Sequence, residues 1–457
     1  MPRTLIANAR LLTLHPGAPF LAAASLVLDD GIVAAVLDDP EPRDVHAERI
    51  DAAGGLVFPG LINAHTHCYS SLARGMDAGA AAIDFAALLE TLWWRLDACL
   101  EAEDVQLSAM LAARDSLRLG VTTLFDHHAS YGCIAGSLEQ VASGLEQVGV
   151  RSVVCFEISD RAGKEAARQA LAENVRQAET GWSPPFRLGT MLGLHASFTL
   201  SDATLEEAAA VARTHGLAVH VHGAEDGVDR VSGARQGTGV VERLTRFGLL
   251  EPGAIVAHAV HLDAAEIRAL AAQGVAIAHN ARSNMNNGVG RADPGAMARA
   301  GAQVVLGTDA YGAGLLAEAR AAILLQRQQP RLGSGDVIAE CLLQGNPSLA
   351  AGRLPLLGRI LPGAPADVVV TRYVPPTPCT EANAWAHLLH GEVEPAVRAV
   401  FVAGERVLDE ARCTLVDEAE LGERCRERAA LLWERFRRAT PRWQTSRGGA
   451  GDSGRTT

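Results

Sequence analysis

Long apolar segments are missing from this sequence, and so is an N-terminal signal. No stretch approaches the roughly 18 consecutive apolar residues that a membrane-spanning helix requires. The N-terminal segment MPRTLIANARLLTLHPG interrupts its apolar residues with Arg, Asn and His, so it lacks the continuous apolar core of a signal peptide. We therefore expect a soluble, cytoplasmic protein with no membrane partner.

Paired cysteines and an excess of positive charge are missing as well. The eight cysteines are scattered and form no CxxC motif, which argues against a disulfide framework and favours a reducing compartment. The net charge is −12, whereas a protein that binds nucleic acid needs a clustered cationic surface. These absences argue against a nucleic-acid partner, and we expect a small-molecule substrate.

What is present suffices for one large domain and a smaller one. The chain has 457 residues, of which 48% are hydrophobic and 21% charged, as in ordinary globular proteins. Residues 1–56 and 355–415 both contain short alternating strands separated by turns, so we predict that the two ends form one small β-sandwich. Residues 416–440 contain a predicted helix at about 418–438, and the Gly/Ser-rich residues 441–457 are predicted to be disordered.

Short apolar strands alternate with helical stretches between these ends, over residues 57–354. This alternation predicts repeated βα units and a parallel sheet. One of the helices is expected to begin at a cap formed by Asp202. Eight candidate strands match the number in a closed (β/α)8 TIM barrel, which makes the fold class α/β. The candidates are FPGLINAH, VTTLFDHH, VRSVVCFE, RLGTMLGLHA, LAVHVHG, AIVAHA, VAIAHN and VVLGTD.

Histidine or aspartate ends nearly every one of these strands. In barrels of this kind the carboxyl ends of the strands carry the chemistry. His65 and His67 are two residues apart on one strand, so their side chains leave on the same face and can reach one ion. His222 and Asp309 end two other strands. Three neutral imidazoles and one carboxylate leave a position open for water, as in a catalytic zinc site.

Four segments resemble the motifs of the amidohydrolase superfamily, namely PGLINAHTH, HVHGAE, VAHAVH and VLGTD. The resemblance covers nearly the whole chain and is to the aminohydrolase branch, which contains nucleobase deaminases and related chlorohydrolases. LWWRLD, DHHAS and HNARSNMNN resemble the SsnA-type aminohydrolases more closely. The resemblance implies four metal ligands, which are His65, His67, His222 and Asp309.

The same resemblance implies three catalytic residues. Glu225 would protonate a ring nitrogen of the substrate, and His258 would steady the attacking oxygen. Asp309 would accept the proton of the attacking water while it stays beside the metal. His220 alternates with His222 along one strand, and we expect it to form a hydrogen bond near the metal rather than to bind the ion.

Lysine is nearly absent, because Lys164 is the only one. Binuclear relatives use a carboxylated lysine at a strand end to bridge two ions, whereas Lys164 lies in the polar helical stretch RAGKEAARQALAENVRQAE. One divalent ion is therefore expected, zinc with iron as the alternative. The absence of a PCxxC motif also excludes the unrelated zinc deaminase fold.

The favoured hypothesis is an aminohydrolase that deaminates a small nitrogen heterocycle of the purine, pyrimidine or pterin kind. Metal-bound hydroxide would attack the amino-bearing carbon, and ammonia would be released. An alternative is hydrolysis of another C–N or C–Cl bond, in a triazine-type or amide substrate. A noncatalytic accessory protein on the same scaffold would tolerate loss of ligands, and none is missing here. The resemblance also implies a homo-oligomer, a dimer or larger.

The residues that contact the substrate are harder to assign from the sequence. His195 could equally be a satisfied histidine at a strand end, and Trp93 could pack in the core. Loop structure alone explains the polar residues that follow the seventh strand. The candidates for substrate contacts are His195, Arg282, Ser283, Asn284, Trp93 and His128.

Overall fold

The computed structural model describes residues 3–15, 17, 19–79, 82–180, 185–328 and 336–439. Within these ranges, no helix combines the length and the apolar character needed to cross a bilayer. The tail at 441–457, for which the sequence predicted disorder, lies outside the described residues.

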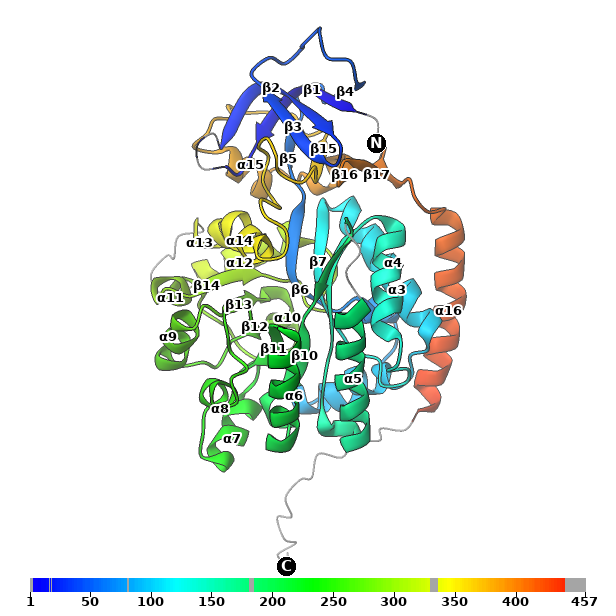
Figure 1. Ribbon diagram of the computed structural model, residues 1–457, viewed down its shortest axis with the longest axis vertical. Coiled ribbons are helices and arrows are strands. Elements are labelled where there is room, and N and C mark those ends of the chain that lie inside the picture. Colours follow the sequence, from blue (N-terminus) through cyan, green and yellow to red (C-terminus); the bar gives the residue numbers. More distant parts are fainter. Residues whose placement is uncertain are drawn as a thin grey trace, which may run out of the picture.

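Strands from both ends of the chain form one mixed sheet at one end of the molecule (Figure 1). The strand β5 pairs in parallel with β1 and antiparallel with β15, and so joins the N-terminal strands to the C-terminal ones. The predicted union of the two ends is confirmed. Residues 57–59, assigned to the barrel from the sequence, belong to this sheet instead. Its strands are β1 (Thr4–Leu12), β2 (Phe20–Asp29), β3 (Ile32–Leu37), β4 (Glu48–Asp51), β5 (Leu56–Pro59), β15 (Val368–Thr371), β16 (Val397–Val402), β17 (Glu405–Asp409) and β18 (Arg412–Cys413).

The terminal sheet has a core of its own and one buried polar link to the rest of the chain. Ile6, Leu26 and Phe401 share a buried apolar cluster that draws on both chain ends. Arg151 forms two hydrogen bonds of 2.8 Å with Asp367, and both side chains are buried. Because Arg151 begins a barrel strand and Asp367 precedes β15, this bidentate pair fixes the sheet against the barrel.

The remaining strands close into the predicted parallel barrel. Pairing runs from β6 to β9 and from β10 to β14, and bridges between Thr66 and Asp309 and between Ile158 and Leu194 join the two groups. The predicted fourth strand is interrupted at Met191 and forms β9 and β10. The strands are β6 (Leu61–Thr66), β7 (Val121–His128), β8 (Arg151–Phe156), β9 (Arg187–Thr190), β10 (Leu192–Ala196), β11 (Val219–Gly223), β12 (Ile255–His258), β13 (Ala276–His279) and β14 (Gln303–Leu306).

Helices surround this barrel (Figure 1). The longer ones are α3 (Ala102–Arg118), α4 (Ser137–Val148), α5 (Lys164–Thr180), α6 (Asp202–His215), α7 (Gly227–Gln236), α8 (Val240–Arg246), α9 (Ala264–Ala272), α12 (Leu315–Arg327), α15 (Ala384–His390) and α16 (Glu418–Arg438). The shorter ones are α1 (Phe85–Leu88), α2 (Trp94–Asp97), α10 (Ala281–Asn286), α11 (Pro294–Arg299), α13 (Asp336–Glu340) and α14 (Asn346–Ala351). Single 3-10 or π turns are η1 (Cys68–Ala73), η2 (Leu89–Trp93), η3 (Asp160–Ala162), η4 (Ser197–Thr199), η5 (Cys341–Gly345) and η6 (Glu394–Ala396).

Two helix predictions had different outcomes. The C-terminal helix α16 has the expected bounds and lies against α3 on the outside of the barrel (Figure 1). The expected cap of α6 is wrong, because Ser201 accepts the hydrogen bond from Thr204 N–H. Asp202 is the first residue of the helix, and its carboxylate lies 2.6 Å from the buried Arg243 guanidinium. Asp202 therefore forms a salt bridge with a residue distant in the sequence and does not cap the helix.

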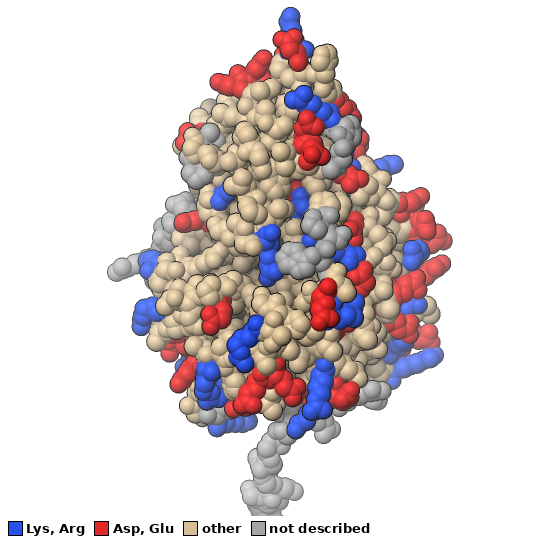
Figure 2. Space-filling view, in the orientation of Figure 1, with Lys and Arg blue, Asp and Glu red and all other residues tan. Residues whose placement is uncertain are grey.

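Charged side chains of both signs are interspersed on the face of the molecule that Figure 2 shows. Acidic and basic groups alternate there over the terminal sheet and over the barrel helices. Opposite charges placed close together in this way largely screen one another over a short distance.

Candidate metal centre and active site

Four side chains converge where the barrel strands end. His65 is on β6, His67 follows it, His222 is on β11, and Asp309 follows β14. His67 Nε2 lies 2.9 Å from Asp309 Oδ1 and 3.2 Å from His222 Nε2, and His65 Nε2 lies 3.6 Å from the same Asp309 oxygen. A tetrahedral ion with bonds of about 2.1 Å would hold its ligands about 3.4 Å apart. The spacing of these atoms therefore fits a divalent ion.

The three imidazoles are oriented by their other nitrogen atoms. Fixing one ring nitrogen in a hydrogen bond leaves the second free to face an ion. His65 Nε2 is buried and has no hydrogen-bond partner among the described residues, as expected of an atom that binds a metal. The orienting bonds run from His67 Nδ1 to the His127 carbonyl oxygen, from His222 Nδ1 to the His195 carbonyl oxygen (2.8 Å), and between His65 Nδ1 and His220 Nε2 (2.8 Å).

The backbone is strained at the same strand ends. Ala224, His258, Ala259 and Asp309 have positive φ angles of 50°, 74°, 51° and 54°. Residues other than glycine rarely adopt this conformation, and it persists only where the surrounding structure enforces it. Three strand ends thus bend sharply to direct their side chains into the centre.

Glu225 and His258 face each other beside the four converging side chains. Glu225 Oε2 lies 3.5 Å from His258 Nε2, and Glu225 Oε1 accepts a hydrogen bond of 3.3 Å from Asn287. The His258 Nδ1 atom lies 2.8 Å from Asn284 Oδ1, which fixes the ring. Burial raises the pKa of Glu225 to about 7. A carboxyl group with this pKa can hold or release a proton near neutral pH.

Asp309 is kept ionised by its neighbours. Burial alone would raise the pKa of Asp309, but the neighbouring imidazoles of His65 and His67 lower this pKa well below its ordinary value. Ser283 also donates a hydrogen bond to Asp309 Oδ2. An ionised carboxylate is the form that binds a cation.

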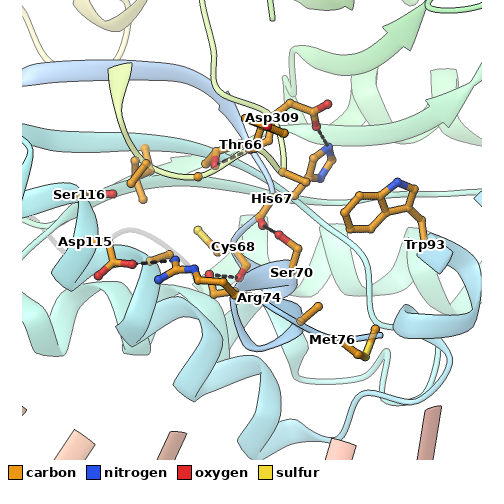
Figure 3. A pocket seen from close by; sticks show the side chains of 18 of the residues that line it. Thr66, His67, Cys68, Ser70, Arg74, Met76, Trp93, Asp115, Ser116 and Asp309 are labelled. Carbon is orange, nitrogen blue, oxygen red and sulfur yellow. Dashed lines mark hydrogen bonds and ion pairs between the residues drawn. The ribbon is translucent and has the colours of Figure 1, made fainter. Parts of the chain in front are cut away.

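Two adjoining cavities open at this centre. The larger has a volume of about 310 Å³, and Trp93, His67 and Asp309 line it together with the Arg74–Asp115 pair (Figure 3). The smaller has a volume of about 50 Å³ and reaches Glu225, His195 and His258. Trp93, His67, Asp309 and Ala310 line both cavities. In Figure 3 the Trp93 ring lies beside His67.

The predicted substrate contacts separate into three groups. His195 and Trp93 line the cavities, and Ser283 and Asn284 hold Asp309 and His258 from behind. The Arg282 guanidinium instead lies 2.6 Å from the buried Glu318 carboxylate, and His128 Nε2 lies 2.9 Å from Ser130 Oγ. Neither of these two residues is among the lining of either cavity, and a substrate contact at Arg282 or His128 stays a prediction.

Sequence reasoning missed two carboxylates that line the smaller cavity. Asp97 ends α2, and Glu157 directly follows β8. Glu157 carried a signal, since it ends the predicted strand VRSVVCFE as the histidines end theirs. Asp97 has no comparable signal in the sequence, because it does not end a predicted strand. It lies in the segment LWWRLD, whose tryptophans are the candidates for stacking on a ring.

Comparison with known proteins agrees with this geometry. Residues 56–407 match the Amidohydrolase family. The chain belongs to this family. A 5-methylthioadenosine/S-adenosylhomocysteine deaminase of Desulforudis audaxviator is 30% identical over 401 residues, which cover 85% of this chain and 89% of that protein. The resemblance drawn from the four motifs is confirmed.

Two solved structures share the fold of this amidohydrolase. An adenosine deaminase from Xanthomonas campestris with bound zinc has a TM-score of 0.83 at 24% identity, and the match covers 95% of this chain and 99% of that one. An atrazine chlorohydrolase from Arthrobacter aurescens TC1 complexed with zinc has a TM-score of 0.78 at 23% identity, covering 94% and 100%. Both confirm the predicted barrel with an additional domain.

Proposed function

We propose that this amidohydrolase is a mononuclear, metal-dependent aminohydrolase. Its substrate would be a small nitrogen heterocycle of the purine, pyrimidine or pterin kind, converted from C–NH2 to C=O with consumption of water and release of ammonia. The convergence of four ligand-type side chains beside the Glu225–His258 pair carries the proposal. The deaminase name of the relative from Desulforudis audaxviator supports it.

The ion would be held by His65, His67, His222 and Asp309, and the spacing of their atoms supports this assignment. Zinc is the first choice and iron the second. The ion would supply a Lewis acid that lets water act as a nucleophile near pH 7. The fold of a zinc-containing adenosine deaminase, shared with this chain, supports zinc. From the family resemblance we also propose a cytoplasmic homo-oligomer, a dimer or larger.

The side chains around the ion would move the protons. Asp309 Oδ2, which lies 3.9 Å from His258 Nε2, would take the proton of the attacking water. Glu225 would deliver a proton to the ring nitrogen next to the reacting carbon, so that negative charge does not build up on the ring. His258 would donate a hydrogen bond to the developing oxygen anion from a ring that Asn284 holds in place.

A second candidate is hydrolysis of another C–N bond or a C–Cl bond. The atrazine chlorohydrolase that shares the fold supports this candidate, because the same water-activating centre would serve a different leaving group. The third hypothesis, an accessory protein, has less support, since all four ligand-type side chains and the Glu225–His258 pair are present.

Release of ammonia tests the proposal directly. The zinc-loaded protein is incubated with aminopurines, aminopyrimidines and aminopterins, and its matched control is Glu225→Gln. We expect the substitution to lower turnover roughly 100- to 10,000-fold while one equivalent of metal stays bound. Absence of ammonia from the whole panel with metal bound would contradict deamination. Chloride release from a chlorotriazine would then support the second candidate.

A further inference from the structure

One side of the smaller cavity is built from a buried charged network, called here the carboxylate wall and formed by Trp94, Asp97, Glu157 and Arg161. Trp94 and Asp97 are three residues apart on α2 and so share one face of the helix. Arg161, on η3, forms a hydrogen bond of 2.5 Å with Glu157 Oε1 and another with Asp97 Oδ2. The side chains of all three charged residues are at most 5% exposed.

Three polar atoms of the wall are buried without a partner. Asp97 Oδ1, Trp94 Nε1 and Arg161 Nε form no hydrogen bond with any described residue. Buried polar groups are nearly always paired, and leaving them unpaired is costly. Trp94 and Asp97 line the smaller cavity together with Glu157, whereas Arg161 does not, so one acceptor and one donor are left there for a bound molecule to satisfy.

The wall lies next to the metal centre. Glu157, His195 and His222 each place a possible ligand atom within 4.8 Å of the others. Glu157 is therefore within reach of a ring held at the metal. A second cation at this spot is disfavoured, because the Arg161 guanidinium already neutralises the Glu157 carboxylate.

We propose that the carboxylate wall selects heterocycles that carry a ring N–H beside a carbonyl oxygen, that is, a lactam edge. The N–H would donate to Asp97 or Glu157, and the carbonyl oxygen would accept from Trp94 Nε1. This inference rests on the proposed function and narrows its substrates to amino-lactams. The adenine ring carries neither a ring N–H beside a carbonyl nor the carbonyl itself, so it lacks this edge.

Binding of matched ligands tests the wall. The metal-loaded Glu225→Gln protein holds ligands without turning them over, and calorimetry gives their dissociation constants. Isocytosine carries the lactam edge and 2-aminopyrimidine lacks it, with the ring and amino group unchanged. We expect isocytosine to bind at least roughly 10-fold more tightly, the effect of one hydrogen bond to a charged group. Equal binding of the two would overturn the proposal.

Substitutions then locate the preference. Adding Glu157→Gln or Asp97→Asn should weaken isocytosine binding roughly 10-fold or more and leave 2-aminopyrimidine within about threefold. The matched control is Glu139→Gln, because Glu139 also pairs with an arginine, Arg187, at 2.8 Å but away from the cavities. Equal losses of affinity for isocytosine and 2-aminopyrimidine would overturn the proposal. So would binding of a second equivalent of zinc that is lost in Glu157→Gln, because Glu157 would then be a metal ligand.

A ligand-based measurement covers the case in which these variants do not fold. Guanine should bind the metal-loaded Glu225→Gln protein more tightly than 1-methylguanine, which lacks the ring N–H beside the carbonyl. Equal binding of the two would refute the proposed role of the carboxylate wall. The two proposals fail in different ways. If the protein prefers lactams but the wild-type protein releases no ammonia, the proposed role of the carboxylate wall stands and the deaminase proposal is wrong. If ammonia is released without a preference for lactams, the deaminase proposal stands and the role of the wall is wrong.

Discussion

Asp229, in the first turn of α7, shows how burial changes the charge of a side chain. It is 2% exposed, and its Oδ1 atom has no hydrogen-bond partner among the described side chains and backbone groups. Burial raises its pKa to about 7, although the backbone N–H groups of Ala224 and Phe198 favour the ionised form. In an unfolded chain the same carboxyl would ionise near pH 3.9.

This difference predicts a pH-dependent effect of Asp229→Asn. Between about pH 4 and pH 7 the folded protein keeps a proton that the unfolded chain has lost, so the wild-type protein loses stability as the pH rises through this window. The neutral amide avoids this loss. We expect the variant to be more stable at pH 8, by on the order of 1 to 3 kcal/mol, with the gain disappearing near pH 4. Urea unfolding at several pH values measures it.

The exposed Asp38→Asn provides the comparison, because its side chain faces solvent in the loop after β3. Its effect on the free energy of unfolding should stay within about 0.5 kcal/mol at every pH. A gain for Asp229→Asn that does not vary with pH would contradict the assigned cause.

At the scale of single elements, local patterns predicted most of the barrel. Strand and helix periodicity is a property of neighbouring residues, and the eight predicted strands and the helix α16 appear at the expected places. Failures occurred where a distant partner decides the outcome. The strand β5 pairs with β1 and β15 and so belongs to the terminal sheet, and Asp202 forms an ion pair with Arg243. Neither partner can be read from the adjacent sequence.

The contact between α16 and α3 depends on one buried carboxylate. Asp104 is fully buried, caps the start of α3 through the Glu101 N–H, and pairs with Arg428 at 2.9 Å and with Arg435. Asp104→Ala would remove the cap and leave two arginines without this partner. Breaking a buried pair typically costs about 3 to 5 kcal/mol. We expect a loss of stability of about 3 kcal/mol by urea unfolding.

Glu103→Ala is the matched control on the same helix. Its side chain is 47% exposed and lies 3.3 Å from Arg424. Exposed ion pairs contribute about 0 to 1 kcal/mol, so the control should change stability little. Similar losses for Asp104→Ala and Glu103→Ala would show that the buried carboxylate has no special role in docking α16.

At the scale of the whole molecule, the candidate site is assembled from distant segments. The sequence predicted the four ligand-type residues because each ends a strand or follows one, and parallel strands bring their carboxyl ends together. It did not predict the carboxylate wall, since Asp97, Glu157 and Arg161 come from α2, the end of β8 and η3. Their contacts depend on how a loop helix folds back over the barrel. The Arg151–Asp367 pair, 216 residues apart, was missed for the same reason.

Metal binding should stabilise the whole fold, because the ligands lie on β6, β11 and the end of β14 and are brought together only in the folded chain. A ligand that binds only the folded state at 1,000 times its dissociation constant adds about 4 kcal/mol. We expect a chelator to lower the melting temperature of the wild-type protein and zinc to restore it. His65→Ala removes the buried Nε2 atom, which has no hydrogen-bond partner in the part of the chain that the structure describes, and should abolish this response to zinc. His390→Ala, at an exposed position on α15, should melt and respond to zinc as the wild-type protein does. A zinc response that survives in His65→Ala would place the ion elsewhere and would remove the basis of the proposed active site.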